Sequence, residues 1–116
     1  MGGLPYWLLQ KDSQVKLRTS DPSFMGWAEK WLTVLCQKLA PLAIDNGGPI
    51  VMVQIENEYG SYATQTGHSD TGYLIRLRDL ATKHFGSSIV LFSTDSGKCD
   101  IGKLHRWKRL CSLTRS

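Results

Sequence analysis

The 116-residue sequence lacks any apolar stretch long enough to cross a membrane. It also lacks the charged and then apolar N-terminal pattern of a secretory signal peptide, and it contains no Asn-x-Ser/Thr glycosylation site. We therefore expect no membrane-spanning segment. The compartment stays open, because these absences are informative only if the chain starts at its natural N-terminus.

Cysteine and histidine are scarce, with three of each. Cys36, Cys99 and Cys111 are odd in number, widely spaced and form no Cys-x-x-Cys pair, so the sequence indicates no disulfide framework. The histidines cluster neither with one another nor with cysteine at the spacing of zinc ligands. We expect no metal and no cofactor. Cys36 falls on an apolar helix face and is interpreted as a small core residue.

A strong charge of one sign is also missing, since the net charge is only +4. Most of the excess lies at the end of the chain, where six Lys/Arg stand against one Asp from Lys98 onward. A basic tail can bind nucleic acid, but Trp107 is its single aromatic residue and no nucleic-acid motif accompanies it. We expect no nucleic-acid partner, and we interpret residues 98–116 as a divergent, disordered tail.

Periodic apolar residues are present and predict two amphipathic helices. The first begins at Asp21-Pro22, a capping side chain followed by proline at the first helical position. It is expected over residues 21–45, with Pro41 kinking or ending it. The second covers residues 73–85.

Two short apolar runs, residues 50–55 and 89–92, predict strands buried on both faces, as in a parallel sheet covered by helices. Residues 1–20 and 60–72 are predicted to be loops. Helices and strands that alternate with short links indicate a βαβ arrangement with parallel strands. One α/β domain is the most that this length allows.

The first of these strands ends in Glu56-Asn57-Glu58, and folding gives no reason for carboxylates there. In parallel α/β folds, chemistry is placed at the carboxyl ends of the strands. Strand alternation predicts that Glu56 and Glu58 share one face. Side chains on one strand face reach a bound substrate from the same side, so these two neighbours do not form a catalytic pair that acts from opposite sides of a bond.

One segment in particular resembles the fourth-strand signature of glycoside hydrolase family 35, the β-galactosidases: Gln54-Ile55-Glu56-Asn57-Glu58-Tyr59-Gly60-Ser61-Tyr62. Four more segments match the family in its order: Gly2-Gly3-Leu4-Pro5-Tyr6-Trp7-Leu8-Leu9, Leu17-Arg18-Thr19-Ser20-Asp21-Pro22, Asn46-Gly47-Gly48-Pro49-Ile50 and Val90-Leu91-Phe92-Ser93-Thr94-Asp95. The resemblance implies that residues 1–97 form part of a (β/α)8 (TIM) barrel, roughly its strands three to five.

The resemblance also implies roles for single residues. Glu58 matches the family's general acid/base, and Asn57 matches the asparagine that hydrogen-bonds the sugar's 2-hydroxyl. Tyr59 either lines the substrate pocket or simply packs, and Glu56 is expected to be a supporting carboxylate. In the family the nucleophile is a glutamate on the seventh strand, and a galactose-binding glutamate lies upstream of the position of Met1. This chain contains neither.

The implied reaction removes a terminal, non-reducing β-D-galactose from a galactoside by a retaining mechanism. A whole barrel takes about 250 residues, so we expect the chain to be a piece that is inactive alone, from a truncated gene model, an alternative transcript or a fragment. Family members suggest a lysosome, vacuole or cell-wall location, and no oligomeric state is predicted. Two alternatives remain: a non-catalytic truncated product, or a small α/β partner-binding module. Tyr6 and Trp7 are interpreted as barrel core in preference to sugar-stacking platforms.

Overall fold

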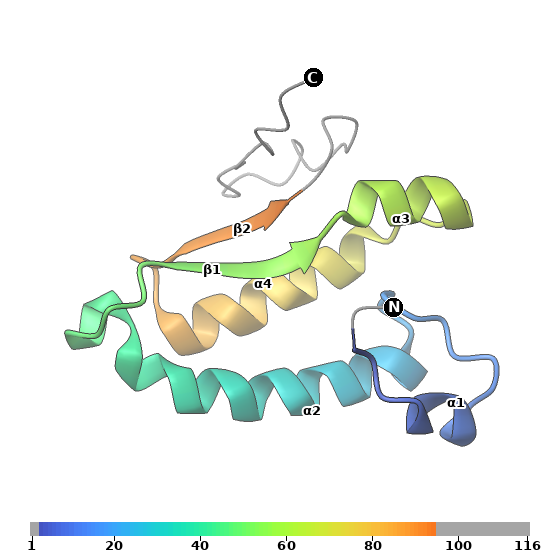
Figure 1. The fold of residues 1–116 in the computed structure, drawn as a ribbon, viewed down its shortest axis with the longest axis horizontal. Helices are drawn as coiled ribbons and strands as arrows, with labels where there is room; N and C mark the ends of the chain where they lie inside the picture. The colour runs from blue at the N-terminus through green and yellow to red at the C-terminus, as the bar shows by residue number, and fades with distance from the viewer. Residues whose placement is uncertain (1–2, 95–116) are drawn as a thin grey trace.

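The computed structural model describes residues 3–94 of the chain. Figure 1 shows two strands side by side, with α4 and then α2 lying along one side of them. The elements in chain order are α1 (Trp7–Lys11), α2 (Pro22–Leu39), two 3-10 turns (Ala40–Leu42 and Ile44–Asn46), β1 (Met52–Asn57), α3 (Tyr59–Thr66), α4 (Thr71–Phe85) and β2 (Val90–Thr94). The predicted tail lies outside the described residues.

The sheet consists of β1 and β2, which pair in parallel as the βαβ rhythm predicts. Their register runs from Met52 opposite Val90 to Asn57 opposite Thr94, with one shift between Gln54 and Glu56. Both carboxyl ends therefore meet at one edge, where α3 begins. The α/β class is confirmed, whereas a closed barrel is not seen among the described residues.

The long helix α2 begins as predicted and ends earlier than predicted. The Asp21 carboxylate accepts a hydrogen bond from the Ser23 backbone N–H at 2.9 Å, and Pro22 occupies the first turn. Regular helix stops at Leu39, because Pro41 cannot donate to the helix ladder and its ring would clash with the preceding turn. Two 3-10 turns then lead toward β1.

Two glycines shape this approach to β1. Gly47 adopts a φ of 79°, which a residue with a side chain rarely adopts. At Gly48 an added Cβ would lie 2.0 Å from the Leu42 carbonyl oxygen, so only glycine fits. The chain then pairs briefly at Ala43 and Ile50 before β1 starts.

Both predicted loops contain a helix. The loop predicted over residues 60–72 is wrong, because residues 59–66 form α3 despite their glycine, serine and threonine content. The hydroxyl groups of Thr64 and Thr66 satisfy helix carbonyls four residues back, and buried Tyr59 anchors the first turn. The loop predicted over residues 1–20 contains α1, which buries Leu8.

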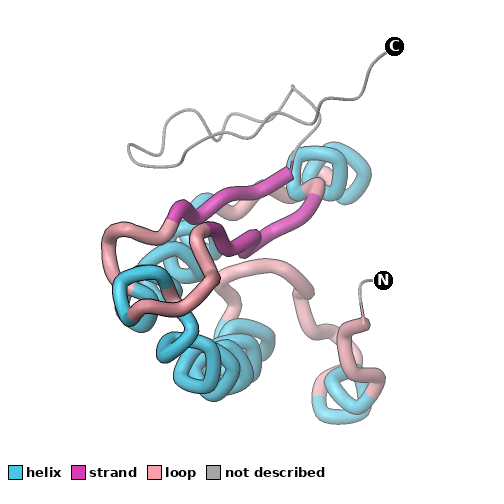
Figure 2. The backbone as a smooth tube through the Cα atoms, turned by 60° about the vertical axis from the view of Figure 1, so that its left-hand side comes forward, coloured by secondary structure: helices cyan, strands magenta, loops and turns pink. Residues whose placement is uncertain are grey.

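Burial is one-sided, contrary to the prediction that both strand faces are covered. Figure 2 shows the helices gathered on one side of the strand pair. Val51 is 50% exposed and Met52 39% exposed, whereas Val53 and Ile55 face the helices and are half-buried. The buried residues form two clusters, one around Phe24, Met25, Tyr59, Tyr73, Leu74, Leu77 and Leu8, the other around Cys36, Ala43, Ala81, Phe85 and Ile89.

Candidate active site

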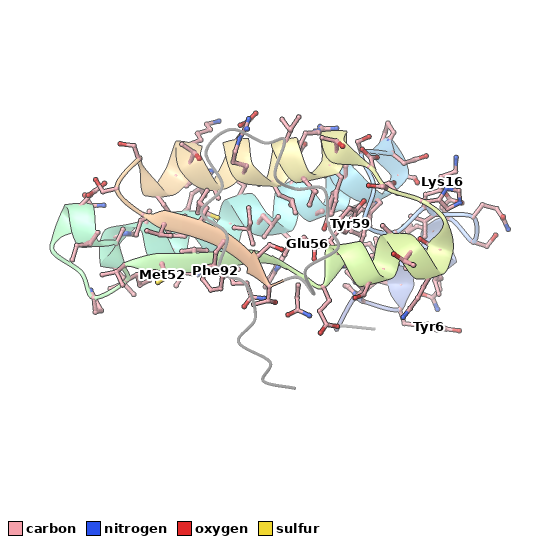
Figure 3. The ribbon with its side chains drawn as sticks, turned by 90° about the horizontal axis from the view of Figure 1, so that it is seen from above. Tyr6, Lys16, Met52, Glu56, Tyr59 and Phe92 are labelled. Carbon is pink, nitrogen blue, oxygen red and sulfur yellow. The ribbon has the colours of Figure 1, made fainter. Side chains whose placement is uncertain are left out.

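A hollow of about 630 Å³ opens at the carboxyl end of β1. Glu56, Asn57 and Glu58 all line it, together with Arg18 from the loop before α2 and Tyr73 from α4. The loop before α2 and the helix α4 thus contribute to a surface around three consecutive residues, as do α2 and α3. Figure 3 shows Glu56 and Tyr59 at this end of the molecule, with Met52 near the opposite end of β1.

A β-bulge lies just before Glu56 in β1. The register shift between Gln54 and Glu56 leaves Ile55 and Glu56 both half-buried in succession, so the strict alternation of β1 is broken. A bulge re-aims side chains in this way. Glu56 consequently turns toward the helices, while Glu58 is exposed. The prediction that Glu56 and Glu58 share one face is wrong, because Glu58 lies beyond the strand in a left-handed conformation while Glu56 turns inward.

Both oxygens of the Glu56 carboxylate accept hydrogen bonds. Its side chain is only 6% exposed, and Arg18 spans both of its oxygens, with Nε 3.0 Å from Oε1 and Nη2 2.6 Å from Oε2. The Tyr73 hydroxyl donates to Oε1 at 2.8 Å, and the Asn57 backbone N–H donates to Oε2 at 2.5 Å. A carboxylate so occupied is a structural one, in keeping with the supporting role expected for Glu56.

The charges in this network reinforce one another. Burial alone would lower the pKa of Arg18, but the hydrogen bonds and the charge of Glu56 outweigh it, so the pKa of the guanidinium is raised. Burial is also the main reason why the pKa of Tyr73 is raised, with the adjacent Glu56 charge adding to it. Tyr73 therefore remains a hydrogen-bond donor to Glu56, and Arg18 remains a cation.

Glu58 lies just beyond β1 in a left-handed conformation, with φ 50°. Its backbone N–H donates to the Thr94 carbonyl at 2.6 Å, and its carbonyl accepts from the Tyr62 N–H at 3.0 Å. Within residues 3–94 its carboxylate has no hydrogen-bond partner. The backbone of Glu58 is thus fixed on both sides, while its carboxylate is presented to the hollow.

Asn57 is exposed beside it, and the two ends of its side-chain amide differ. The oxygen Oδ1 accepts from Thr94 Oγ1 at 2.6 Å and from Gln54 Nε2 at 3.1 Å. Among the described residues the amide nitrogen has no acceptor. Gln54 and Thr94 therefore orient Asn57 so that its N–H groups are available to a ligand in the hollow.

Tyr59 is buried, with 1% of its surface exposed, and it does not line the hollow. Its hydroxyl donates to the Arg18 carbonyl at 3.1 Å and accepts from the Asp70 N–H at 3.0 Å. Burial raises the pKa of this phenol, so it remains protonated. Of the two roles considered for Tyr59, these contacts favour packing, and substrate contact by this residue stays an untested prediction.

Sequence reasoning missed the partners that organise the site. Arg18 lies in the segment Leu17–Pro22, to which the resemblance assigned no role. Tyr73 is the first residue of the helix predicted over residues 73–85. Gln54 and Thr94 were likewise assigned only to strands. Their one sequence signal is that Gln54 and Thr94 stand at the ends of the predicted parallel strands, where the side chains must meet.

Three further observations concern two exposed aromatic residues, metal ligands and membrane-spanning helices. Tyr6 and Trp7 were interpreted as core, but they are 77% and 41% exposed, and Trp7 packs edge-on against Trp27 at 5.1 Å. Between residues 3 and 94 no group of three or more potential ligands is placed to hold a metal. No helix in that range is both long and apolar enough to cross a bilayer.

Comparison with known proteins shows the family that the chain resembles. The model of the family described as Glycosyl hydrolases family 35 matches residues 1–110. The chain is 46% identical over 97 residues to "Beta-galactosidase 17" of Arabidopsis thaliana, covering 84% of this chain and 13% of that protein. It is 50% identical over 95 residues to "Beta-galactosidase" of Homo sapiens, covering 82% of this chain and 13% of that protein.

"Beta-galactosidase" of Canis lupus familiaris is also 50% identical over 95 residues, which cover 82% of this chain and 14% of that protein. The chain thus spans only about one-seventh of the length of these relatives. The matched region still contains the whole strand end that carries Glu56, Asn57 and Glu58. On this match, the chain belongs to glycosyl hydrolases family 35.

Proposed function

We propose that the chain supplies the acid/base side of the active site of a β-galactosidase, with Glu58 as the general acid and then the general base. The observation that carries this proposal is an exposed carboxylate, without a hydrogen-bond partner among residues 3–94, on a fixed backbone at the carboxyl end of a parallel strand where it lines a hollow. Active sites of (β/α)8 enzymes occupy that position. The relatives are named for the same activity.

In the proposed reaction, Glu58 protonates the glycosidic oxygen as the bond to a terminal β-galactose breaks. A second carboxylate, on the opposite face of the sugar, forms the covalent glycosyl-enzyme, and Glu58 then activates the water that hydrolyses it. Asn57 binds the 2-hydroxyl through its amide nitrogen. The second carboxylate comes from a part of the barrel outside these 116 residues. No cofactor takes part, and a lysosomal, vacuolar or cell-wall location follows from the family alone.

The test needs the remainder of the enzyme, which a chimera can provide: a full-length β-galactosidase with the aligned segment of this chain in place of its own. Glu58→Gln should lower kcat/KM for an alkyl galactoside by roughly 100-fold or more, since a general acid contributes that much. For a dinitrophenyl galactoside, kcat/KM should fall far less, because its leaving group departs without a proton.

Glu29→Gln is the matched control. Glu29 is a partly exposed carboxylate on α2 that pairs with Arg76 at 2.7 Å and does not line the hollow. Glu29→Gln should leave kcat/KM unaffected for both substrates. Equal losses on the two substrates in Glu58→Gln would reject Glu58 as the acid.

A further inference from the structure

We propose that Arg18 is a positioning residue for the acid/base, because it holds the backbone that carries Glu58. The proposal rests on the function proposed above. It concerns a residue in the loop before α2, 40 positions from Glu58 in sequence, which touches the strand end from the side of the helices.

The first argument is that Arg18 reaches Asn57 by two routes. Directly, its Nη2 donates to the Asn57 carbonyl oxygen at 2.7 Å. Indirectly, it pairs with Glu56, whose Oε2 accepts the Asn57 backbone N–H. Both polar groups of the Asn57 backbone are therefore held by one ion pair, and Glu58 is attached directly to Asn57.

The second argument is that Arg18 is itself held in place. Its guanidinium lies over the ring of Tyr62, 4.3 Å from the centroid, and near that of Tyr59 at 5.3 Å. The Tyr59 hydroxyl donates to the Arg18 carbonyl, and the Tyr62 hydroxyl donates to the Leu17 carbonyl at 2.9 Å. Both tyrosines belong to α3, so the loop, the strand end and the following helix form one unit.

The third argument is backbone conformation. Among residues 3–94, Arg18 and Glu58 are the non-glycine residues with positive φ, at 55° and 50°. Such conformations cost free energy and persist where surrounding contacts enforce them. Arg18 lies in the loop of the unit defined above, and Glu58 lies where its strand passes into α3. By holding Asn57, Arg18 adds to the bonds from Thr94 and Tyr62 that keep Glu58 in its left-handed conformation.

Lysine cannot reproduce the planar fork of arginine, so Arg18→Lys keeps the charge and loses the geometry. In the chimera, Arg18→Lys should lower kcat/KM for the alkyl galactoside roughly 10- to 100-fold, the loss expected from a displacement of about 1 Å. For the dinitrophenyl galactoside the loss should be less than about threefold, since Glu58 is not needed as an acid there. The KM values should change little.

The matched control is Arg76→Lys, since Arg76 forms a similar ion pair with Glu29 on the outer helices. Arg76→Lys should leave kcat/KM unchanged for both substrates. An equal loss on both substrates in Arg18→Lys, or no loss, would overturn the proposal, because a general effect on folding does not depend on the leaving group. If Glu58→Gln itself shows no leaving-group dependence, the proposed function fails and a measurement without turnover decides the role of Arg18.

That measurement is hydrogen exchange at the Asn57 amide. In the parent chimera this amide should be protected, and in Arg18→Lys and Arg18→Ala it should exchange at least about tenfold faster, while the amides of β2 keep their protection. Unchanged protection of Asn57 in a folded Arg18 variant would show that Arg18 does not hold this backbone.

Discussion

Asn57 illustrates how a single residue is prepared for a ligand by its neighbours. Its amide oxygen is taken by Thr94 and Gln54, so only its N–H groups are presented to the hollow. An asparagine without these partners would rotate between two nearly equivalent orientations. The pair of strands therefore converts a general polar side chain into a directed donor.

We expect Asn57→Ala, in the chimera, to lower kcat/KM for a galactoside roughly 100-fold, because hydrogen bonds to the 2-hydroxyl strengthen in the transition state. With a 2-deoxygalactoside as substrate the variant and its parent should differ by less than about threefold, since the hydroxyl that the amide binds is missing.

Asn46→Ala serves as the control for the loss of an amide. Asn46 is exposed, and its Nδ2 donates to the Ala40 carbonyl at 2.9 Å, away from the hollow. Asn46→Ala should leave the ratio of the kcat/KM values for the two substrates unchanged. A similar loss on both substrates in Asn57→Ala would mean that Asn57 does not bind the 2-hydroxyl.

At the scale of the element, α2 depends on its first turn. The Asp21 carboxylate accepts hydrogen bonds from both the hydroxyl and the backbone N–H of Ser23, and these bonds lower the pKa of Asp21. A carboxyl whose pKa is lower in the helix than in the coil stabilises the helix above its ordinary pKa of about 3.9. That contribution is lost as the pH falls through the lowered pKa.

We therefore expect a peptide of residues 19–40 to lose helix content as the pH falls from 6 toward 2, followed by circular dichroism. Asn is also a good capping residue and does not titrate, so Asp21→Asn should retain more helix at low pH. Glu29 is present in both peptides, so the difference between them isolates Asp21. Parallel curves for the two peptides would contradict the capping argument.

At the scale of the whole molecule, the described residues cover only one side of the sheet. Met52 is exposed on the side away from the helices, and in the described range each strand pairs along only one edge. An unpaired edge beside an uncovered apolar face promotes association. Such surfaces suit a piece of a larger barrel better than an independent partner-binding module.

We expect the 116-residue polypeptide alone to show no turnover of a chromogenic β-galactoside, because among residues 3–94 the only other carboxylate lining the hollow is Glu56, which is already paired with Arg18. The assay compares purified protein, free of host enzyme, with the active chimera. Turnover that Glu58→Ala abolishes would contradict this expectation, and Glu56 would be the first residue to test as a substitute nucleophile.

The sequence by itself determined what depends on local pattern. Apolar spacing predicted α2 and α4, a short apolar run predicted each strand, and alternation of elements predicted parallel pairing. The position of Asn57 and Glu58 at a strand end followed from the same run. These features are set by neighbours within a few positions, so they can be read along the chain.

Only the tertiary structure decided how the two glutamates differ. A one-residue bulge turns Glu56 toward Arg18 and Tyr73. The periodicity of the sequence does not predict this bulge. The helix α3 likewise forms from residues of low helix propensity, because Tyr59 is buried beneath it. Arg18 and Glu56 lie 38 positions apart, and contacts at that separation arise from packing of the whole chain.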